Sequence, residues 1–161
     1  MTALPIAIAP IVTTALIVII LALLVACVAT DIRSRIIPNR LILPIACLAL
    51  PYWAAADPHL ADRLMDQAAV IAVAAIPLLL LFTIGAWGGG DVKLSAALLL
   101  WLPWADAAAA ALIMAVAGGV LALLMLPFGR RAIDRGVPYG VAIAVGAALP
   151  LAARLPWPGQ P

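Results

Sequence analysis

The stretch Gly88-Gly89-Gly90-Asp91-Val92-Lys93 places three glycines and two charged residues between two long apolar runs. A second charged segment, with the sequence DIRSRIIPNR from Asp31 to Arg40, ends an earlier apolar run. Glycine lets the backbone approach a neighbouring group closely because it has no Cβ. We therefore expect the fold to bring Asp31 and Asp91 together at one face of a membrane.

The composition indicates an integral membrane protein. Of the 161 residues, 68% are hydrophobic and 10% are charged, and the mean hydropathy is +1.25. Soluble domains are only about 45–50% apolar. The length predicts one domain over residues 1–161. The net charge of +2 is too small to indicate binding to nucleic acid.

The sequence disfavours several kinds of active site. Cys27 and Cys47 lie inside apolar runs, so we interpret them as small hydrophobic residues. No His-Glu-x-x-His pair is present for zinc, and the single histidine, His59, lies in a different loop from Asp31 and Asp91. The triple glycine lacks the spacing of a phosphate-binding loop. We therefore expect no metal, no cofactor and no serine or cysteine nucleophile.

Six apolar runs predict an all-α fold with six transmembrane helices. A helix needs about 20 residues to cross a bilayer core. The runs are Ala3–Thr30, Leu41–Ala56, Ala68–Trp87, Leu94–Trp104, Ala107–Phe128 and Pro138–Ala153. The fourth run is the weakest, since its length covers only about half a bilayer at ~1.5 Å per residue. Pro38 and Asn39 predict the start of the second helix, and Asp57–Gln67 is expected to form a loop.

The basic residues predict the orientation of these helices. If six spans alternate in direction, most basic residues fall on one side; these are Arg33, Arg35, Arg40, Lys93, Arg130, Arg131 and Arg135. Arg63 and Arg154 fall on the other side with most of the aspartates. Cytoplasmic loops carry the excess of lysine and arginine. We therefore expect segments 31–40, 88–93 and 129–137 to face the cytoplasm and both termini to face outside.

On this topology Asp31 and Asp91 lie on the same side of the membrane at similar depth. Two carboxylates held close together do not both ionise easily, so the pair shares a proton near its working pH. The ionised member then acts as general base on a water molecule, and the protonated member polarises the scissile carbonyl group. Such a pair hydrolyses a peptide bond without metal, serine or cysteine.

Each charged residue also has a simpler interpretation. Asp91 is a suitable N-cap for a helix that begins at Val92. Asp31 is suited to be a solvated charge that pairs with Arg33 or Arg35. Lys93 either lowers the pKa of Asp91, holds a substrate group or serves as a plain cytoplasmic charge. The arginines of the cytoplasmic segments are most simply orientation signals and contacts to anionic lipids.

At these two clusters the sequence resembles the type IV prepilin peptidase family, aspartic proteases of the bacterial inner membrane. In that family one catalytic aspartate precedes an Ile-Pro-Asn-like segment, and the other ends a G-x-G-D motif that is followed by Val-Lys. The resemblance implies that Asp31 and Asp91 are catalytic. It implies supporting motif roles for Gly88, Gly90, Lys93, Pro38 and Asn39. The segment Val137-Pro138-Tyr139-Gly140 also resembles the start of the family's last span.

The resemblance further implies a substrate and a location. The substrate is a prepilin, which consists of a short basic leader, a cleavage site and then an apolar helix. Cleavage takes place at the cytoplasmic face of the bacterial inner membrane, and the other partners are membrane lipids.

The sequence departs from the bifunctional members of this family. Those members carry an extra N-terminal cytoplasmic region with Cys-x-x-Cys motifs and also methylate the new N-terminus. This chain begins with an apolar run and has no such motif. It resembles the short, peptidase-only type that serves Flp (tight-adherence) pili, so no methyltransferase activity is expected.

Two rival hypotheses remain at this point. The main one is a non-enzymatic membrane component of a pilus or secretion assembly that keeps the same fold. The second rival is a small transporter. It is disfavoured because the sequence shows neither a charged site near the bilayer midplane nor a repeat of spans.

Overall fold

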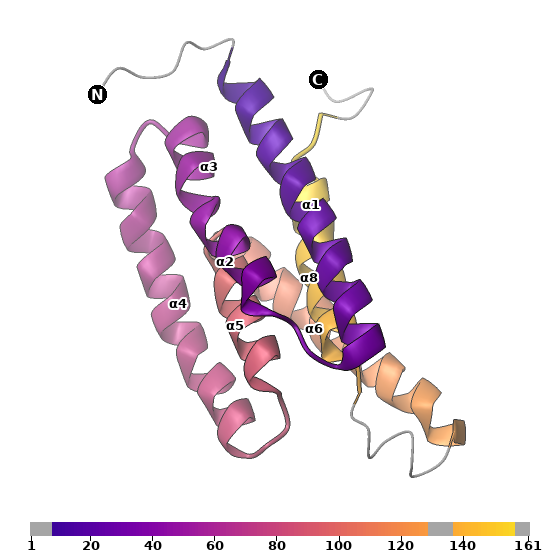
Figure 1. Ribbon diagram of the computed structural model, residues 1–161. Helices are drawn as coiled ribbons and strands as arrows, with labels where there is room; N and C mark the ends of the chain where they lie inside the picture. Colours follow the sequence, from indigo (N-terminus) through magenta and orange to yellow (C-terminus); the bar gives the residue numbers. More distant parts are fainter. Residues whose placement is uncertain (1–7, 129–136, 157–161) are drawn as a thin grey trace.

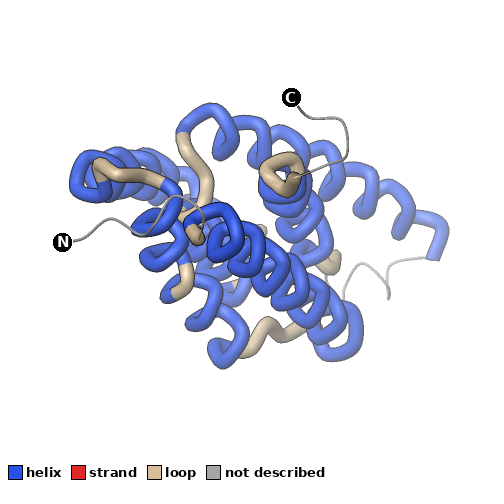
Figure 2. Tube along the Cα trace, turned by 90° about the horizontal axis from the view of Figure 1, so that it is seen from above, coloured by secondary structure: helices blue, strands red, loops and turns tan. Residues whose placement is uncertain are grey.

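The computed structural model describes residues 8–128 and 137–156. Its elements are α1 (Ala9–Ser34), α2 (Asn39–Cys47), α3 (Ala49–Ala56), α4 (Leu60–Thr83), α5 (Gly89–Leu99), α6 (Trp104–Met125), the short 3₁₀ helix η1 (Leu126–Phe128) and α8 (Tyr139–Ala152) (Figure 1). Figure 2 shows that helices and loops account for all of the described chain, which contains no strand. The prediction of an all-α fold is confirmed.

Four stretches of helix are long and apolar enough to cross a membrane. They are α1, the consecutive helices α2 and α3 taken together, α4 and α6. Helix α5 has 11 residues and α8 has 14. At ~1.5 Å per residue, α5 covers roughly half a bilayer, as expected for the fourth apolar run. The chain is therefore a multi-span helical membrane protein, and the count of six spans with both termini outside stays a prediction.

The helices run alternately up and down the bundle (Figure 1). The start of α1, the turn between α3 and α4 and the end of α8 lie at one end. The end of α1, the loop between α4 and α5 and the start of α8 lie at the other end. This alternation brings Asp31, in the last turns of α1, to the same end as Asp91, in the first turn of α5.

Helix α8 packs against both α1 and α6 and forms the centre of the core. Seven of its 14 residues are buried, and five of these seven are glycine or alanine; the seven are Gly140, Ala142, Ile143, Ala144, Gly146, Ala147 and Leu151. Without long side chains between them, helix backbones approach closely, which is how membrane helices gain packing energy. Small residues therefore set the distance between α8 and its neighbours.

The close packing of α8 against α6 can be tested at Gly146 of α8. A Cβ added to Gly146 would lie 2.6 Å from the carbonyl oxygen of Ala110 and 3.0 Å from Cβ of Met114, both on α6. A Cβ added to Gly119 of α6 would have nothing within 4 Å. We expect Gly146→Ala to destabilise the protein by about 1–3 kcal/mol, because backbone must move to make room.

The matched control is Gly119→Ala, which we expect to be neutral or to stabilise the protein by up to ~1 kcal/mol, since alanine favours a helix interior over glycine. Thermal unfolding of the two variants in detergent, measured beside the wild type, checks both expectations. An unfolding temperature for Gly146→Ala equal to that of the wild type would show that α6 and α8 are not packed this closely.

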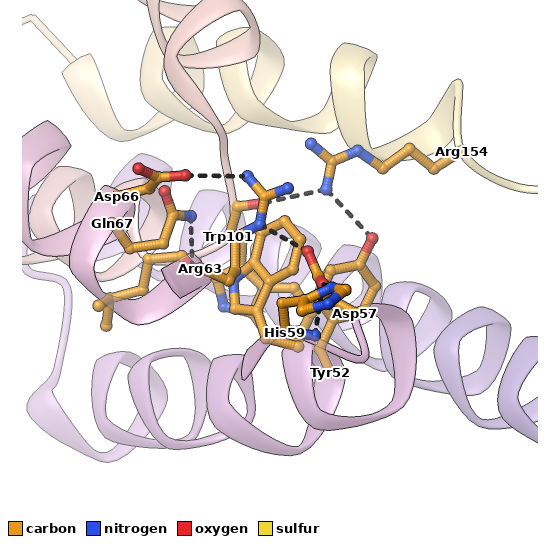
Figure 3. Close-up of polar contacts among 10 residues, drawn as sticks. Tyr52, Asp57, His59, Arg63, Asp66, Gln67, Trp101 and Arg154 are labelled. Atoms are coloured by element: carbon orange, nitrogen blue, oxygen red, sulfur yellow. Dashed lines mark hydrogen bonds and ion pairs between the residues drawn. The ribbon is translucent and has the colours of Figure 1, made fainter. Parts of the chain in front are cut away.

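The expectation of a loop over Asp57–Gln67 is wrong in its second part, because α4 begins at Leu60. Asp57 organises this helix start. Its Oδ1 accepts the main-chain N–H of His59 at 2.9 Å, and its Oδ2 accepts Nε of Arg63 at 3.1 Å (Figure 3). These contacts hold the pKa of Asp57 below its usual value, with the bond from His59 as the main cause. The charged residues after Asp57 thus belong to the first turns of a helix.

At the same end of the bundle, Arg154 follows α8 and forms hydrogen bonds to α3, to the segment after α5 and to α6. Figure 3 shows its side chain beside these contacts. Its Nη1 donates to the hydroxyl group of Tyr52 at 3.1 Å and to the carbonyl oxygen of Trp101 at 3.0 Å. Its Nη2 donates to the carboxylate of Asp106. Gln67 adds a bond from Nε2 to the carbonyl oxygen of Leu100 at 3.0 Å, where α5 ends. Such bonds satisfy carbonyl groups that a helix C-terminus leaves free.

Candidate active site

Asp31 is buried at the end of α1, with 5% of its surface exposed. Its Oδ2 accepts a hydrogen bond of 2.9 Å from the main-chain N–H of Gly140, in the first turn of α8. The interpretation of Asp31 as a solvated charge is wrong for this reason. No ion pair among the described residues includes Asp31, and Arg33 and Arg35 are exposed. A backbone amide therefore takes the place of an arginine as the partner of this carboxylate.

Arg35 ends α1 and turns the chain toward α2. It has a φ of 56°, the only positive φ of a non-glycine residue in the described part of the chain. Its N–H donates to the main-chain carbonyl oxygen of Asp31 at 2.9 Å, which closes the helix. Residues other than glycine rarely adopt this left-handed conformation. The turn directs the chain back across the end of α1, beside Asp31.

Asp91 is the third residue of α5 and is half-buried. The expectation that it is the N-cap of a helix from Val92 is wrong, because α5 begins at Gly89 and Gly88 is the N-cap. Asp91 still helps to cap this helix, since its Oδ2 accepts the main-chain N–H of Gly88 at 3.2 Å. Burial raises the pKa of Asp91 to about 6; the bond from Gly88 opposes this rise and the charge of Asp31 adds to it.

Asp31 and Asp91 line one cavity of about 190 Å³. The other lining residues are Arg35, Ile36, Ile37, Gly88, Gly89 and Gly90. A buried water needs roughly 10–15 Å³ of such space, so the cavity has room for several waters or for a short piece of extended peptide. Residues from the end of α1 with the loop after it, and from the start of α5, about 50 positions further along the sequence, thus surround the two carboxylates.

The glycines of the motif allow this close approach. A Cβ added to Gly90 would lie 3.4 Å from Cβ of Ile37, in the loop between α1 and α2. A Cβ added to Gly88 would lie 3.3 Å from Oδ2 of Asp91. The start of α5 therefore lies directly against the loop that follows Asp31. From the sequence we expect the glycine backbone to approach a substrate strand or the partner carboxylate. In the structure its close neighbours are Ile37 and the Asp91 side chain, and the approach to a substrate strand stays a prediction.

The other predicted motif residues lie at the rim of this site. Pro38 is the N-cap of α2, and Asn39 is its first residue, so the predicted helix start is correct to within one position. Nζ of Lys93 donates to Oδ1 of Asn39 at 3.5 Å. Within the described chain Lys93 forms no ion pair with Asp91. Lys93 therefore connects α5 to α2 instead of contacting the carboxylate beside it in the sequence.

Gly140 is the residue of this site to which we assigned no role from the sequence. A Cβ added to it would lie 2.7 Å from Oδ2 and 2.9 Å from Cγ of Asp31, and 3.0 Å from Cδ1 of Ile37. Only glycine fits at this position without displacing the carboxylate. The signal that points to it is Pro138 just before an apolar run, because helix N-termini carry free N–H groups that bind anions.

Fold and site together define a class of protein. It is a multi-span helical membrane protein with two carboxylates in one cavity at one end of the bundle. No group of three His, Cys, Asp or Glu residues suited to hold a metal occurs among the described residues. A carboxylate with a raised pKa beside a second carboxylate is suited to general acid–base chemistry on water.

The sequence profile of the type IV leader peptidase family matches residues 17–123. This chain belongs to that family, and the matched region contains Asp31, Asp91 and the loops around them. Curated relatives from two species carry the name prepilin leader peptidase/N-methyltransferase. The one from Burkholderia pseudomallei is 31% identical over 141 residues, which cover 81% of this chain and 43% of the relative. The one from Bacillus subtilis is 32% identical over 138 residues, which cover 82% and 53%.

The chain thus spans about half the length of the curated relatives that it matches. No solved structure gives a significant match to the chain.

Proposed function

We propose that this protein is a membrane aspartic endopeptidase that removes the basic leader from type IV prepilins of the Flp type. The observation that carries the proposal is the shared cavity of Asp31 and Asp91, which come from helices far apart in sequence. Membership in the type IV leader peptidase family supports the substrate class. The relatives' second named activity, N-methylation, is not part of the proposal.

In the proposed mechanism Asp31 is the ionised carboxylate and Asp91 carries the proton. The main-chain N–H of Gly140 donates to Asp31, and such bonds stabilise a negative charge. The raised pKa of Asp91 keeps its proton available. Asp31 takes a proton from a water molecule while the water oxygen attacks the scissile carbonyl carbon. Asp91 donates its proton to the carbonyl oxygen, which forms a gem-diol. When this tetrahedral intermediate collapses, Asp31 gives its proton to the leaving amine and Asp91 takes back a proton from a gem-diol hydroxyl, so both carboxyl groups return to their starting states.

We propose that this site faces the cytoplasm across a bacterial inner membrane. The described basic residues at the Asp31 end are Arg33, Arg35, Arg40 and Lys93, all of which are exposed. The other basic residues expected on this side, Arg130, Arg131 and Arg135, lie outside the described residues. Excess arginine and lysine marks the cytoplasmic side of a membrane protein. A leader that remains in the cytoplasm would then present its scissile bond at the end of the bundle where the cavity lies. The same basic residues are suited to contact anionic lipid headgroups.

The direct test is cleavage of a Flp-type prepilin by the purified chain in proteoliposomes. Mass spectrometry of the products identifies the bond that is cut, and we expect a single cut between the basic leader and the apolar helix. Absence of cleavage over a panel of such prepilins would favour the rival hypothesis, a non-enzymatic component of a pilus or secretion assembly.

The pH dependence of this cleavage tests the role of Asp91. Because the acid form of Asp91 is required, activity is present below its pKa of about 6 and is lost as the pH rises through that value. We expect kcat/KM to fall roughly tenfold per pH unit above about pH 7, since kcat/KM reports ionisations of the free enzyme. Returning the enzyme from pH 8 to pH 6 should restore the activity that it had at pH 6 before the change. A profile that is flat or rises between pH 6 and pH 8 would contradict Asp91 as the acid.

A further inference from the structure

A second and larger cavity lies between α4 and α6. It has a volume of about 610 Å³ and is lined almost entirely by apolar residues of α4, α5, α6 and α8. Helix α4 packs on α5, whereas α6 packs on α8, so α4 and α6 form opposite walls. Several wall residues, among them Val73 and Leu81 of α4, are exposed or half-buried. We call this space the α4/α6 groove.

The α6 wall of the groove consists mainly of small residues. They are Ala107, Ala108, Ala110, Ala111, Ala115, Gly118, Gly119 and Ala122. Their spacing places them on one side of the helix, while Ala109, Leu112 and Val116 do not line the groove. Small residues on a membrane helix let the backbone of a second helix approach closely. The shape of this wall is therefore suited to a helix.

Ser95 of α5 is an unpartnered polar group in this apolar groove. It lines the cavity with 6% of its surface exposed, and its hydroxyl oxygen has no hydrogen-bond partner among the described residues. A buried hydroxyl without a partner costs free energy, about 1–3 kcal/mol by protein mutation data. A lipid acyl chain offers no acceptor, whereas the carbonyl groups of a peptide do. The hydroxyl oxygen is itself buried, so the Ser95 side chain must rotate toward the cavity that it lines to reach an occupant. After that rotation a peptide segment offers the hydroxyl an acceptor and an acyl chain does not, which favours a peptide as the occupant.

The groove is continuous with the candidate active site. Trp87 and Tyr139 line the groove, and their rings lie 6.1 Å apart between centroids. Trp87 immediately precedes Gly88, the N-cap of α5, whose N–H binds Asp91. Tyr139 immediately precedes Gly140, whose N–H binds Asp31. One end of the groove therefore lies beside both carboxylates.

We propose that the α4/α6 groove binds the apolar helix that follows the scissile bond of the substrate, with the Ser95 hydroxyl as its polar contact. This inference rests on the proposed function, because that function supplies a substrate whose apolar helix begins next to the bond that is cut. A helix in the groove places its first turn beside Trp87 and Tyr139. The scissile bond just before that turn then reaches the cavity of Asp31 and Asp91.

Photo-crosslinking in proteoliposomes tests this placement without requiring catalysis. The photoreactive amino acid p-benzoylphenylalanine replaces Ala115 in the groove or, as the matched control, Ala109 on another side of α6; both alanines are exposed. The probe is a purified Flp-type prepilin, and the enzyme carries Asp31→Asn and Asp91→Asn so that the substrate stays intact. We expect the variant with the photoreactive residue at position 115 to crosslink to the substrate helix and the variant with it at position 109 to give no such crosslink.

Equal crosslinking at both positions, or crosslinks from position 115 to phospholipid alone, would overturn the proposal. The result is separate from the proposed function: cleavage by the wild type without a crosslink at 115 leaves the peptidase intact and rejects the groove. A crosslink at 115 without cleavage by the wild type supports the groove and rejects the peptidase.

Kinetics of groove variants give a second measurement. Ala115→Phe fills the groove, so we expect KM for the full prepilin to rise about tenfold with kcat retained, because substrate binding is lost before the chemical step. Ala109→Phe is expected to keep the KM of the wild type. Ser95→Ala is expected to raise KM severalfold at an unfolding temperature equal to or above that of the wild type, because the substitution removes an unpartnered buried hydroxyl. An unchanged KM for Ala115→Phe would contradict the proposed position of the helix.

Discussion

Replacement of either Asp31 or Asp91 by asparagine is expected to abolish cleavage of the prepilin, with a loss of at least about 10³-fold in kcat/KM. Asparagine keeps the size of the side chain but neither accepts a proton from water nor donates one to a carbonyl oxygen. The two carboxylates share one cavity, so each variant removes one half of the acid–base pair. The measurement is cleavage in proteoliposomes at equal amounts of folded protein.

The double variant provides an internal check. Residues that act as a unit give losses that do not add, so Asp31→Asn with Asp91→Asn should be about as inactive as either single variant. Asp62→Asn is the matched control, because Asp62 is exposed in the first turn of α4 at the opposite end of the bundle. Retained cleavage in either single variant would contradict the two-carboxylate mechanism.

The second large effect is expected for Gly140→Ala. The new Cβ would lie 2.7 Å from Oδ2 of Asp31, closer than such contacts allow, and the carboxylate must move. A displacement of about 1 Å at a catalytic group costs up to ~10²-fold in rate. We therefore expect kcat to fall roughly 10–100-fold while KM changes little, because Gly140 positions Asp31 and does not contact the apolar helix.

Two controls separate positioning from instability in this variant. The unfolding temperature of Gly140→Ala should stay close to that of the wild type, since the atoms that must move belong to the side chains of Asp31 and Ile37 and not to the backbone. Gly119→Ala, the same substitution at an open position on α6, should keep full activity. Wild-type kcat in Gly140→Ala would show that the bond from Gly140 to Asp31 has no part in the reaction.

Much of the fold follows from local properties of the sequence. The apolar runs predict the long helices because a membrane span needs continuous apolar residues and no partner from elsewhere in the chain. Pro38-Asn39 marks the start of α2 to within one residue. The exception is Asp57–Gln67, where charged residues suggest a loop. In the structure Asp57 and Arg63 pair with each other, Gln67 bonds to the carbonyl oxygen of Leu100 at the end of α5, and the segment from Leu60 is helical.

The surroundings of the two aspartates are formed by residues that lie far from them in the sequence. From the sequence, Asp31 has the neighbours Arg33 and Arg35, which suggest a solvated ion pair. In the structure its partner is the N–H of Gly140, 109 positions away. Asp91 lies at the start of a helix as expected, but the glycines before it are part of that helix and of the cavity. The catalytic role of both residues stays a prediction that the aspartate variants test.

The sequence by itself determined that the chain is helical and embedded in a membrane, and its two charged clusters determined which residues are candidates for chemistry. These properties depend on composition and on the order of neighbouring residues, which the sequence states directly. Only the tertiary structure decided that Gly140 holds Asp31 and that Ser95 lies unpartnered in a groove beside the site. Both depend on how α5, α6 and α8 pack, and packing distances are set by residues that are far apart in the chain.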